Sequence, residues 1–278
     1  MASNYIPFVV IAGGRTGSTM LVRALNSSPH VRCFGEVFNV DVGFVPFGVD
    51  GFDDFSASER ALRHRNSAAF LADRIYGAPP SAVRASGFKL LYGQERRVEG
   101  LMQALLEIDG LHMLHLRRRN YLRTAVSLKI AETTGVWVQG EQNVVAMSNA
   151  LRAARHPLRA ASALAQRFRV RGSSGPAARA PVTLTRKECT DVFDFIETQE
   201  VFYENAFAAH PRWTLYYEDI MERPEREYRQ VLMFLGLDPE DLSITTRKQN
   251  PEPLRELVAN YDELRRAFAG SRYAAFFD

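Results

Sequence analysis

The chain has 278 residues, 46% of them hydrophobic, and a net charge of +3. This length and composition predict one large α/β core, and hence a single domain over residues 1–278. The small net charge lacks the basic field that marks nucleic-acid-binding proteins, so we expect no nucleic acid partner. No stretch approaches the ~20 apolar residues of a membrane span, and residues 1–5 lack a signal-peptide start. Two cysteines, Cys33 and Cys189, are too few for a disulfide framework, so both are expected to be packing residues of a cytoplasmic protein.

The first feature in chain order is a strand, a loop and a helix over residues 8–25. An apolar run ends at Gly13 and Gly14, and apolar residues resume at helical spacing from Met20. The glycines allow a tight turn, and the loop amides and the positive end of the helix dipole would face one anion. We therefore predict a phosphate-binding loop with these contributors: Gly14, Arg15, Thr16, Gly17, Ser18 and Thr19.

This loop departs from the Walker pattern GxxxxGK[ST]. Ser18, and not a lysine, follows Gly17, and the nearby cation is Arg15. An ATP-hydrolysing loop is therefore disfavoured. The order Arg-x-Gly-Ser-Thr directly after a buried strand resembles the 5′-phosphosulfate loop of sulfotransferases that use 3′-phosphoadenosine 5′-phosphosulfate (PAPS). The alternative is an ordinary glycine-rich turn between a strand and a helix.

The second feature is the segment SPHVRCFGEVFN at residues 28–39. It resembles the GE segment of bacterial carbohydrate sulfotransferases, including the trehalose and nodulation-factor types, and of tyrosylprotein sulfotransferases. In those families the glutamate is proposed as the catalytic base, a role that falls on Glu36 here. Such a base needs a pKa raised toward neutrality by partial burial, which we expect of Glu36. If Glu36 is instead a solvated carboxylate, His30 and His115 are the candidate bases.

The third feature is a single charge, Lys89, within the apolar segment SGFKLLYG at residues 86–93. This segment also resembles the bacterial family. A lysine in a buried strand costs several kcal/mol unless it is paired or faces a cleft, so we place Lys89 in the cleft, assisting Glu36 and Arg15 in catalysis. The alternative is a lysine at a sheet edge whose ammonium group reaches solvent.

The fourth feature is the segment LHMLHLRRRNYLRTAVSLKIA at residues 111–131, an apolar strand, a basic turn and a helix. It resembles the family's 3′-phosphate motif, in which an arginine precedes a helical serine by eight positions. These residues are Arg119 and Ser127 here. A guanidinium group and a hydroxyl on a rigid scaffold suit a phosphate dianion, and arginines at the positive end of a helix suggest a bound anion. The alternative is a solvated arginine cluster.

Two weaker features follow. The segment WTLYYEDI at residues 213–220 resembles the family's YED segment, whose tyrosine contacts adenine in several members, and this assigns Tyr217 to cofactor binding. The polar loop TTRKQNP at residues 245–251 corresponds to a loop that closes over the nucleotide in related enzymes, which adds Arg247 and Lys248. The aromatic, glycine-rich residues 38–55, together with Trp137, form either an acceptor site or a packed lid.

The pattern of elements predicts the fold class. Strands near 6–12, 31–34, 87–91, 111–116 and 213–217 alternate with helices, which indicates an α/β, P-loop-like three-layer fold with a central parallel sheet flanked by helices. Amphipathic helices are expected near 98–106, 192–202, 224–235 and 254–268, the second after a Thr185-x-x-Glu188 capping box. A flexible insertion is expected at about 170–182. Both phosphate motifs follow strand ends, where open α/β sheets bind ligands.

The resemblance spans nearly the whole chain. It implies an enzyme that transfers the sulfuryl group from PAPS to a hydroxyl acceptor, with adenosine 3′,5′-bisphosphate as the product and a small molecule or glycan, such as a carbohydrate or glycolipid, as the acceptor. We expect no metal, because the sulfuryl group carries less charge than a phosphoryl group and no ligand cluster is apparent. A P-loop nucleoside or sugar kinase and a non-catalytic nucleotide-binding module remain alternatives. The sequence leaves the oligomeric state open, a homodimer included.

Overall fold

A computed structural model describes residues 5–39, 57–77, 80–134, 180–243 and 251–277. These residues form two compact units, the first from residues 1–120 and 194–246 and the second from residues 121–193 and 247–278. The single domain expected from the sequence stays a prediction. Most of the insertion expected at about 170–182 lies outside the described residues.

The first unit is built on a five-stranded sheet with every pairing parallel. Its strands, in the order β2–β3–β1–β4–β5, are Val31–Phe34, Ala85–Leu91, Ile6–Ala12, His112–Arg117 and Arg212–Tyr216. The five predicted strands and the parallel sheet are thereby confirmed. Because β1 lies between β3 and β4, the carboxyl end of β1 is a topological switch point, the place where α/β sheets bind ligands.

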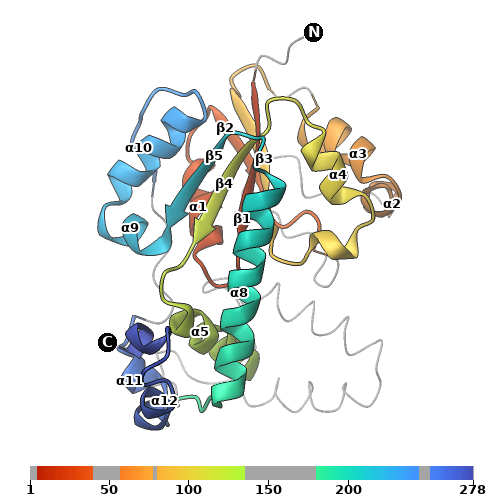
Figure 1. Ribbon diagram of the computed structural model, residues 1–278. Helices are drawn as coiled ribbons and strands as arrows, with labels where there is room; N and C mark the ends of the chain where they lie inside the picture. The colour runs from red at the N-terminus through yellow and green to blue at the C-terminus, as the bar shows by residue number, and fades with distance from the viewer. Residues whose placement is uncertain (1–4, 40–56, 78–79, 135–179, 244–250, 278) are drawn as a thin grey trace, which may run out of the picture. The chain divides into compact units, whose positions relative to one another are not determined.

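Helices cover both faces of this sheet, which confirms the three-layer prediction. On one face, Phe8, Val10 and Ala12 of β1 pack with α1 (Ser18–Leu25), α9 (Tyr217–Glu222) and α10 (Pro224–Phe234). Figure 1 shows α2 (Ala57–Arg65), α3 (Ser67–Phe70) and α4 (Leu101–Leu106) on the other side. There Phe38 makes edge contacts with Phe70 and Phe88. A π-helix at Leu71–Ile75 and a 3₁₀-helix at Glu95–Arg97 complete this layer.

The second unit is helical. It contains α5 (Tyr121–Thr134), the first part of α8 (Arg186–Ala206), α11 (Leu254–Leu257), α12 (Tyr261–Ala267) and a 3₁₀-helix at Ala274–Phe277. Buried residues of all these elements form one core, with Phe193 contacting the rings of Phe268 and Tyr273. The predicted capping box at the start of α8 is confirmed, because Glu188 N–H donates to Thr185 Oγ1 at 3.1 Å and Thr185 N–H donates to Glu188 Oε2 at 2.7 Å.

One predicted helix was wrong in its extent. The stripe at 254–268 forms two helices, because Val258 is extended, with φ −118° and ψ 114°, and forms a parallel bridge with Val182. The Ala259 N–H donates to the Val182 carbonyl at 2.9 Å, a hydrogen bond that the backbone could not make as part of a helix.

The predicted helix from Pro224 is confirmed as α10. Both cysteines are buried and unbridged, as expected of packing residues.

Candidate active site

The phosphate loop follows β1 at the switch point of the sheet. Two of its residues are left-handed, Arg15 with φ 66° and Gly17 with φ 84°. Because the first helical hydrogen bond of α1 runs from Leu21 N–H to the Gly17 carbonyl, the preceding N–H groups of the first turn have no partner within the helix. The first turn of α1 carries no acidic residue. This end of α1 therefore suits an anion.

The Thr16 side chain shapes the loop from within. Its hydroxyl is buried and donates to the Gly13 carbonyl at 2.8 Å. The hydroxyl hydrogen is therefore committed to the loop, which leaves the backbone N–H as the donor that Thr16 could offer a ligand. Glycine is required at Gly17 for a second reason besides its backbone conformation: a Cβ there would lie 2.7 Å from Tyr217 Cδ2. The Tyr217 ring, predicted to contact adenine, thus packs against the loop, and its contact with adenine stays a prediction.

Lys89 links the loop to the candidate base. Its ammonium group lies 2.9 Å from Glu36 Oε1 and donates to Thr19 Oγ1 at 3.2 Å, with a side chain only 1% exposed. Strand pairing creates this contact, since the Lys89 N–H donates to the carbonyl of Gly35 at 3.3 Å. The alternative of a lysine at a sheet edge is wrong, because β3 is an inner strand. Instead of lying free in a cleft, the charge is buried and paired, which offsets its desolvation cost.

Glu36 accepts three polar contacts, and its pKa differs from the sequence expectation. Asn39 Nδ2 and Gln94 Nε2 donate to Oε2 at 2.7 and 3.1 Å, while Lys89 holds Oε1. Burial raises the pKa, but the Lys89 charge and the hydrogen bonds from Lys89, Asn39 and Gln94 outweigh it, so the pKa lies below its ordinary value. The expected rise toward neutrality was therefore wrong. The sequence segment showed the carboxylate but not the cation that pairs with it.

Gln94 is a site residue that the sequence analysis missed. Its Oε1 accepts from the Leu91 N–H at 3.0 Å, so the end of β3 fixes the amide that holds Glu36. The sequence carries only a weak signal for this role, namely a glutamine directly after the segment SGFKLLYG at residues 86–93.

Neither candidate histidine makes a described contact with Glu36 or Lys89. His30 is exposed, with Nδ1 3.0 Å from the Ala82 carbonyl oxygen. His115 is buried, and its Nε2 shares a hydrogen bond of 2.7 Å with the Tyr92 hydroxyl. Burial, followed by the charges of Arg117 and Arg212, lowers the pKa of His115 to about 3. His115 is therefore neutral at physiological pH.

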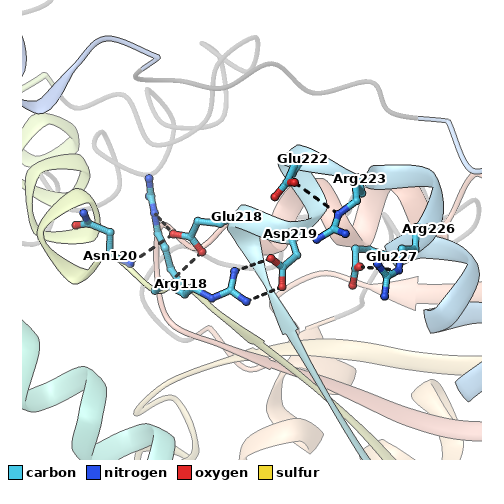
Figure 2. Close-up of polar contacts among 9 residues, drawn as sticks. Arg118, Asn120, Glu218, Asp219, Glu222, Arg223, Arg226 and Glu227 are labelled. Atoms are coloured by element: carbon cyan, nitrogen blue, oxygen red, sulfur yellow. Dashed lines mark hydrogen bonds and ion pairs between the residues drawn. The ribbon is translucent and has the colours of Figure 1, made fainter. Parts of the chain in front are cut away.

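The predicted 3′-phosphate arginine, Arg119, is paired with a carboxylate. Its Nη1 and Nη2 donate to the two oxygens of Asp219 at 2.6 and 2.7 Å (Figure 2). Its guanidinium carbon lies 4.0 Å from the centre of the Tyr216 ring. The Glu218 carboxylate accepts from the backbone N–H groups of Arg119 and Asn120 at 3.0 and 3.4 Å. Two carboxylates of the YED segment thus engage this turn, a pairing that the sequence analysis did not foresee.

The other predicted cofactor residues have mixed outcomes. Ser127 is buried on α5 in the second unit, whereas Arg119 belongs to the first, so their joint action on one phosphate stays a prediction. Arg247, Lys248, Trp137 and residues 40–55 lie outside the described residues.

Among the residues that are described, no group of three or more His, Cys, Asp or Glu side chains is placed to hold a metal ion. Within the same ranges, no helix combines the length and the apolar character needed to cross a bilayer.

Comparison with known proteins gives relatives over the full length. Nodulation protein H of Rhizobium tropici is 26% identical over 275 residues, covering 98% of this chain and 93% of the relative. Nodulation protein H of Rhizobium meliloti is also 26% identical, with 98% and 95% covered. A sulfotransferase from Alicyclobacillus acidocaldarius has a solved structure with a TM-score of 0.45 and 16% identity, over 95% of this chain and 91% of that one. No model of a protein family matches.

The relationship to nodulation protein H agrees with the order of segments along the chain. The phosphate loop, the GE segment and the YED segment all lie within the matched length, and the first two meet in the structure through Lys89. The kinase alternative loses support, because the loop lacks the lysine that follows the second glycine of the Walker pattern. Its cations are instead Arg15 and Lys89. Over 98% of its length the chain is similar to nodulation protein H.

Proposed function

We propose that the protein transfers the sulfuryl group of PAPS to a hydroxyl group of a carbohydrate or glycolipid. One observation supports this more than any other: Lys89 contacts both Glu36 and Thr19, so a single buried cation joins the candidate base to the phosphate loop. In-line transfer requires a base on the acceptor side and positive charge on the donor side within reach of one reacting group. A non-catalytic nucleotide-binding module would not need the base.

The residues at the loop fit the anionic donor. The N–H groups at the start of α1, the Ser18 and Thr19 hydroxyls and the Arg15 charge would hold the 5′-phosphosulfate. Arg119, Ser127 and, from the loop outside the described residues, Arg247 and Lys248 would hold the 3′-phosphate, with Tyr217 near the adenine. When bound, PAPS supplies a sulfuryl group activated by its bond to phosphate.

Glu36 would take the proton of the acceptor hydroxyl. Its pKa lies below the ordinary value, so it is ionised at neutral pH. As the acceptor oxygen bonds to sulfur, the bond between sulfur and the phosphate oxygen breaks, and the electron pair stays on that oxygen. Protonation of Glu36 would also weaken its hold on Lys89, whose ammonium group could then stabilise the charge that develops beside Thr19.

Two experiments test this proposal. Adenosine 3′,5′-bisphosphate without metal should raise the melting temperature, whereas preferential stabilisation by ATP with Mg²⁺ would support a kinase. Radiolabelled PAPS incubated with a panel of glycans and glycolipids should yield a sulfated product. We place the protein in the cytoplasm, because Cys33 and Cys189 are buried and unbridged, as expected in a reducing compartment. Failure of every nucleotide to bind would contradict the proposal.

A further inference from the structure

Arg118 is a second arginine at the end of β4, and it differs sharply from Arg119. Its side chain is only 9% exposed, whereas the Arg119 side chain is 49% exposed. Its Nη1 donates to the backbone carbonyl oxygen of Arg15 at 3.0 Å, which joins the end of β4 to the phosphate loop (Figure 2 shows its side chain beside Glu218). In the sequence the arginines of this turn form one cluster, and only Arg119 matches the spacing of the 3′-phosphate motif.

The carbonyl that Arg118 holds belongs to the strained residue of the loop. Arg15 has a φ of 66°, a conformation that residues with a side chain rarely adopt and that costs them energy. Because a peptide group is planar and trans, fixing the Arg15 carbonyl toward Arg118 turns the following Thr16 N–H to the opposite side. The hydrogen bond therefore sets the direction of a loop donor.

Arg118 also contacts the loop through Tyr217. Its guanidinium carbon lies 4.7 Å from the centre of the Tyr217 ring, within the range of a cation–π interaction. The same ring packs so closely on Gly17 that a Cβ there would lie 2.7 Å from it. Glu218 Oε1 lies 4.0 Å from Arg118 Nε and offsets part of its charge. Arg118 and Tyr217 together contact both left-handed residues of the loop, Arg15 and Gly17.

We propose that Arg118 is a positioning residue for the phosphate loop, with Tyr217 as its partner. It holds the loop in the conformation that binds the 5′-phosphosulfate, while its neighbour Arg119 serves the 3′-phosphate, an assignment that rests on the proposed function. Two consecutive arginines then serve opposite ends of the cofactor. The buried one acts through the protein backbone at the 5′ end, and the exposed one acts directly at the 3′ end.

The experiment compares Arg118→Gln with Arg119→Gln in the full chain by calorimetric titration. The three ligands are adenosine 3′,5′-bisphosphate, adenosine 5′-monophosphate and adenosine 3′-monophosphate. Arg118→Gln should weaken both ligands that carry a 5′-phosphate by about tenfold or more and leave adenosine 3′-monophosphate within roughly twofold. Arg119→Gln should do the reverse, weakening the two ligands that carry a 3′-phosphate. A residue needed only for folding would not separate the ligands in this way.

Further variants keep the test informative if Arg118→Gln folds poorly. Tyr217→Leu should weaken the two 5′-phosphate ligands more than adenosine 3′-monophosphate, which loses only the proposed contact with adenine. Tyr217→Phe, which keeps the ring, should weaken the 5′-phosphate ligands less than Tyr217→Leu does. Arg229→Gln is the matched control, because Arg229 pairs with Asp241 on the surface, away from the loop. Unchanged binding in both Arg118→Gln and Tyr217→Leu, or equal losses for all three ligands, would overturn the role of Arg118. A wild-type protein that binds none of the ligands would instead overturn the proposed function.

Discussion

Glu36 and Lys89 form a buried ion pair with 2.9 Å between Oε1 and Nζ, and their side chains are 19% and 1% exposed. Glu36 follows β2, and Lys89 lies on the neighbouring strand β3. The pair therefore belongs both to the core of the first unit and to the candidate active site. Changes to either residue are expected to affect stability and catalysis in different proportions, which makes the two roles separable by experiment.

Replacing Glu36 by glutamine should reduce sulfuryl transfer by about 10²–10⁴-fold, because the amide keeps the shape of the side chain but cannot accept a proton. Affinity for adenosine 3′,5′-bisphosphate should stay near the wild-type value. A transfer assay with radiolabelled PAPS and a binding titration measure the two effects. Glu107→Gln is the control, because Glu107 is an exposed residue directly after α4. Turnover near the wild-type level in Glu36→Gln would exclude Glu36 as the base.

Replacing Lys89 by methionine should lower the free energy of unfolding by roughly 3–5 kcal/mol, since it leaves the Glu36 carboxylate partly buried without its cation. The double variant Glu36→Gln/Lys89→Met should be more stable than Lys89→Met alone, because no uncompensated charge remains. Urea denaturation of the wild type and three variants gives the coupling energy. Additive effects of the two single changes would show that the pair does not interact in solution.

The activity should stay constant through the neutral pH range as far as Glu36 is concerned. Its folded-state pKa is depressed below its ordinary value of 4.5, so the charged form persists above that value and is lost only as the pH falls through the folded pKa. The stability that the ion pair contributes is likewise present above pH 4.5 and is lost as the pH falls through the folded-state pKa of Glu36. The profile of kcat/KM against pH tests this. An acidic limb near neutrality that disappears in Glu36→Gln would show a raised pKa instead.

His115 should make stability sensitive to mild acid. Burial holds its folded-state pKa at about 3, against 6.5 ordinarily, so the unfolded chain binds a proton that the folded chain excludes. Stability is full above about 6.5 and should fall toward about 3 by ~1.4 kcal/mol per pH unit from this group. Denaturation of the wild type and His115→Gln at several pH values isolates the contribution. Parallel pH profiles for the two proteins would contradict it.

Replacing Asp219 by asparagine should strengthen binding of adenosine 3′,5′-bisphosphate by roughly fivefold, a modest effect because the Arg119–Asp219 pair is partly exposed. The neutral amide would no longer compete with a phosphate for the Arg119 guanidinium group. Binding of adenosine 5′-monophosphate, which lacks the 3′-phosphate, should not change and serves as the internal control. Weaker binding of the bisphosphate would show that Asp219 orients Arg119 for the ligand.

The sequence alone determined the elements and most of the chemical groups. Strands 6–12 and 31–34 matched residue for residue, because each is a short, mostly apolar run that is followed directly by glycine. The phosphate loop was predictable because its glycines and hydroxyls are local requirements of a strand–loop–helix turn. The capping box of α8 was predictable for the same reason, since Thr185 and Glu188 satisfy backbone groups only three residues apart.

Only the tertiary structure decided which of these groups meet. The pairing of β2 with β3 brings Lys89 to Glu36, and that contact reverses the expected direction of the Glu36 pKa. The bridge between Val182 and Val258 divides a helix that periodicity predicted as one. Arg118 and Arg119 are neighbours of equal chemistry, yet one is buried against the phosphate loop and the other faces Asp219. Burial and charge pairing arise from contacts between segments distant in sequence, and no local pattern encodes them.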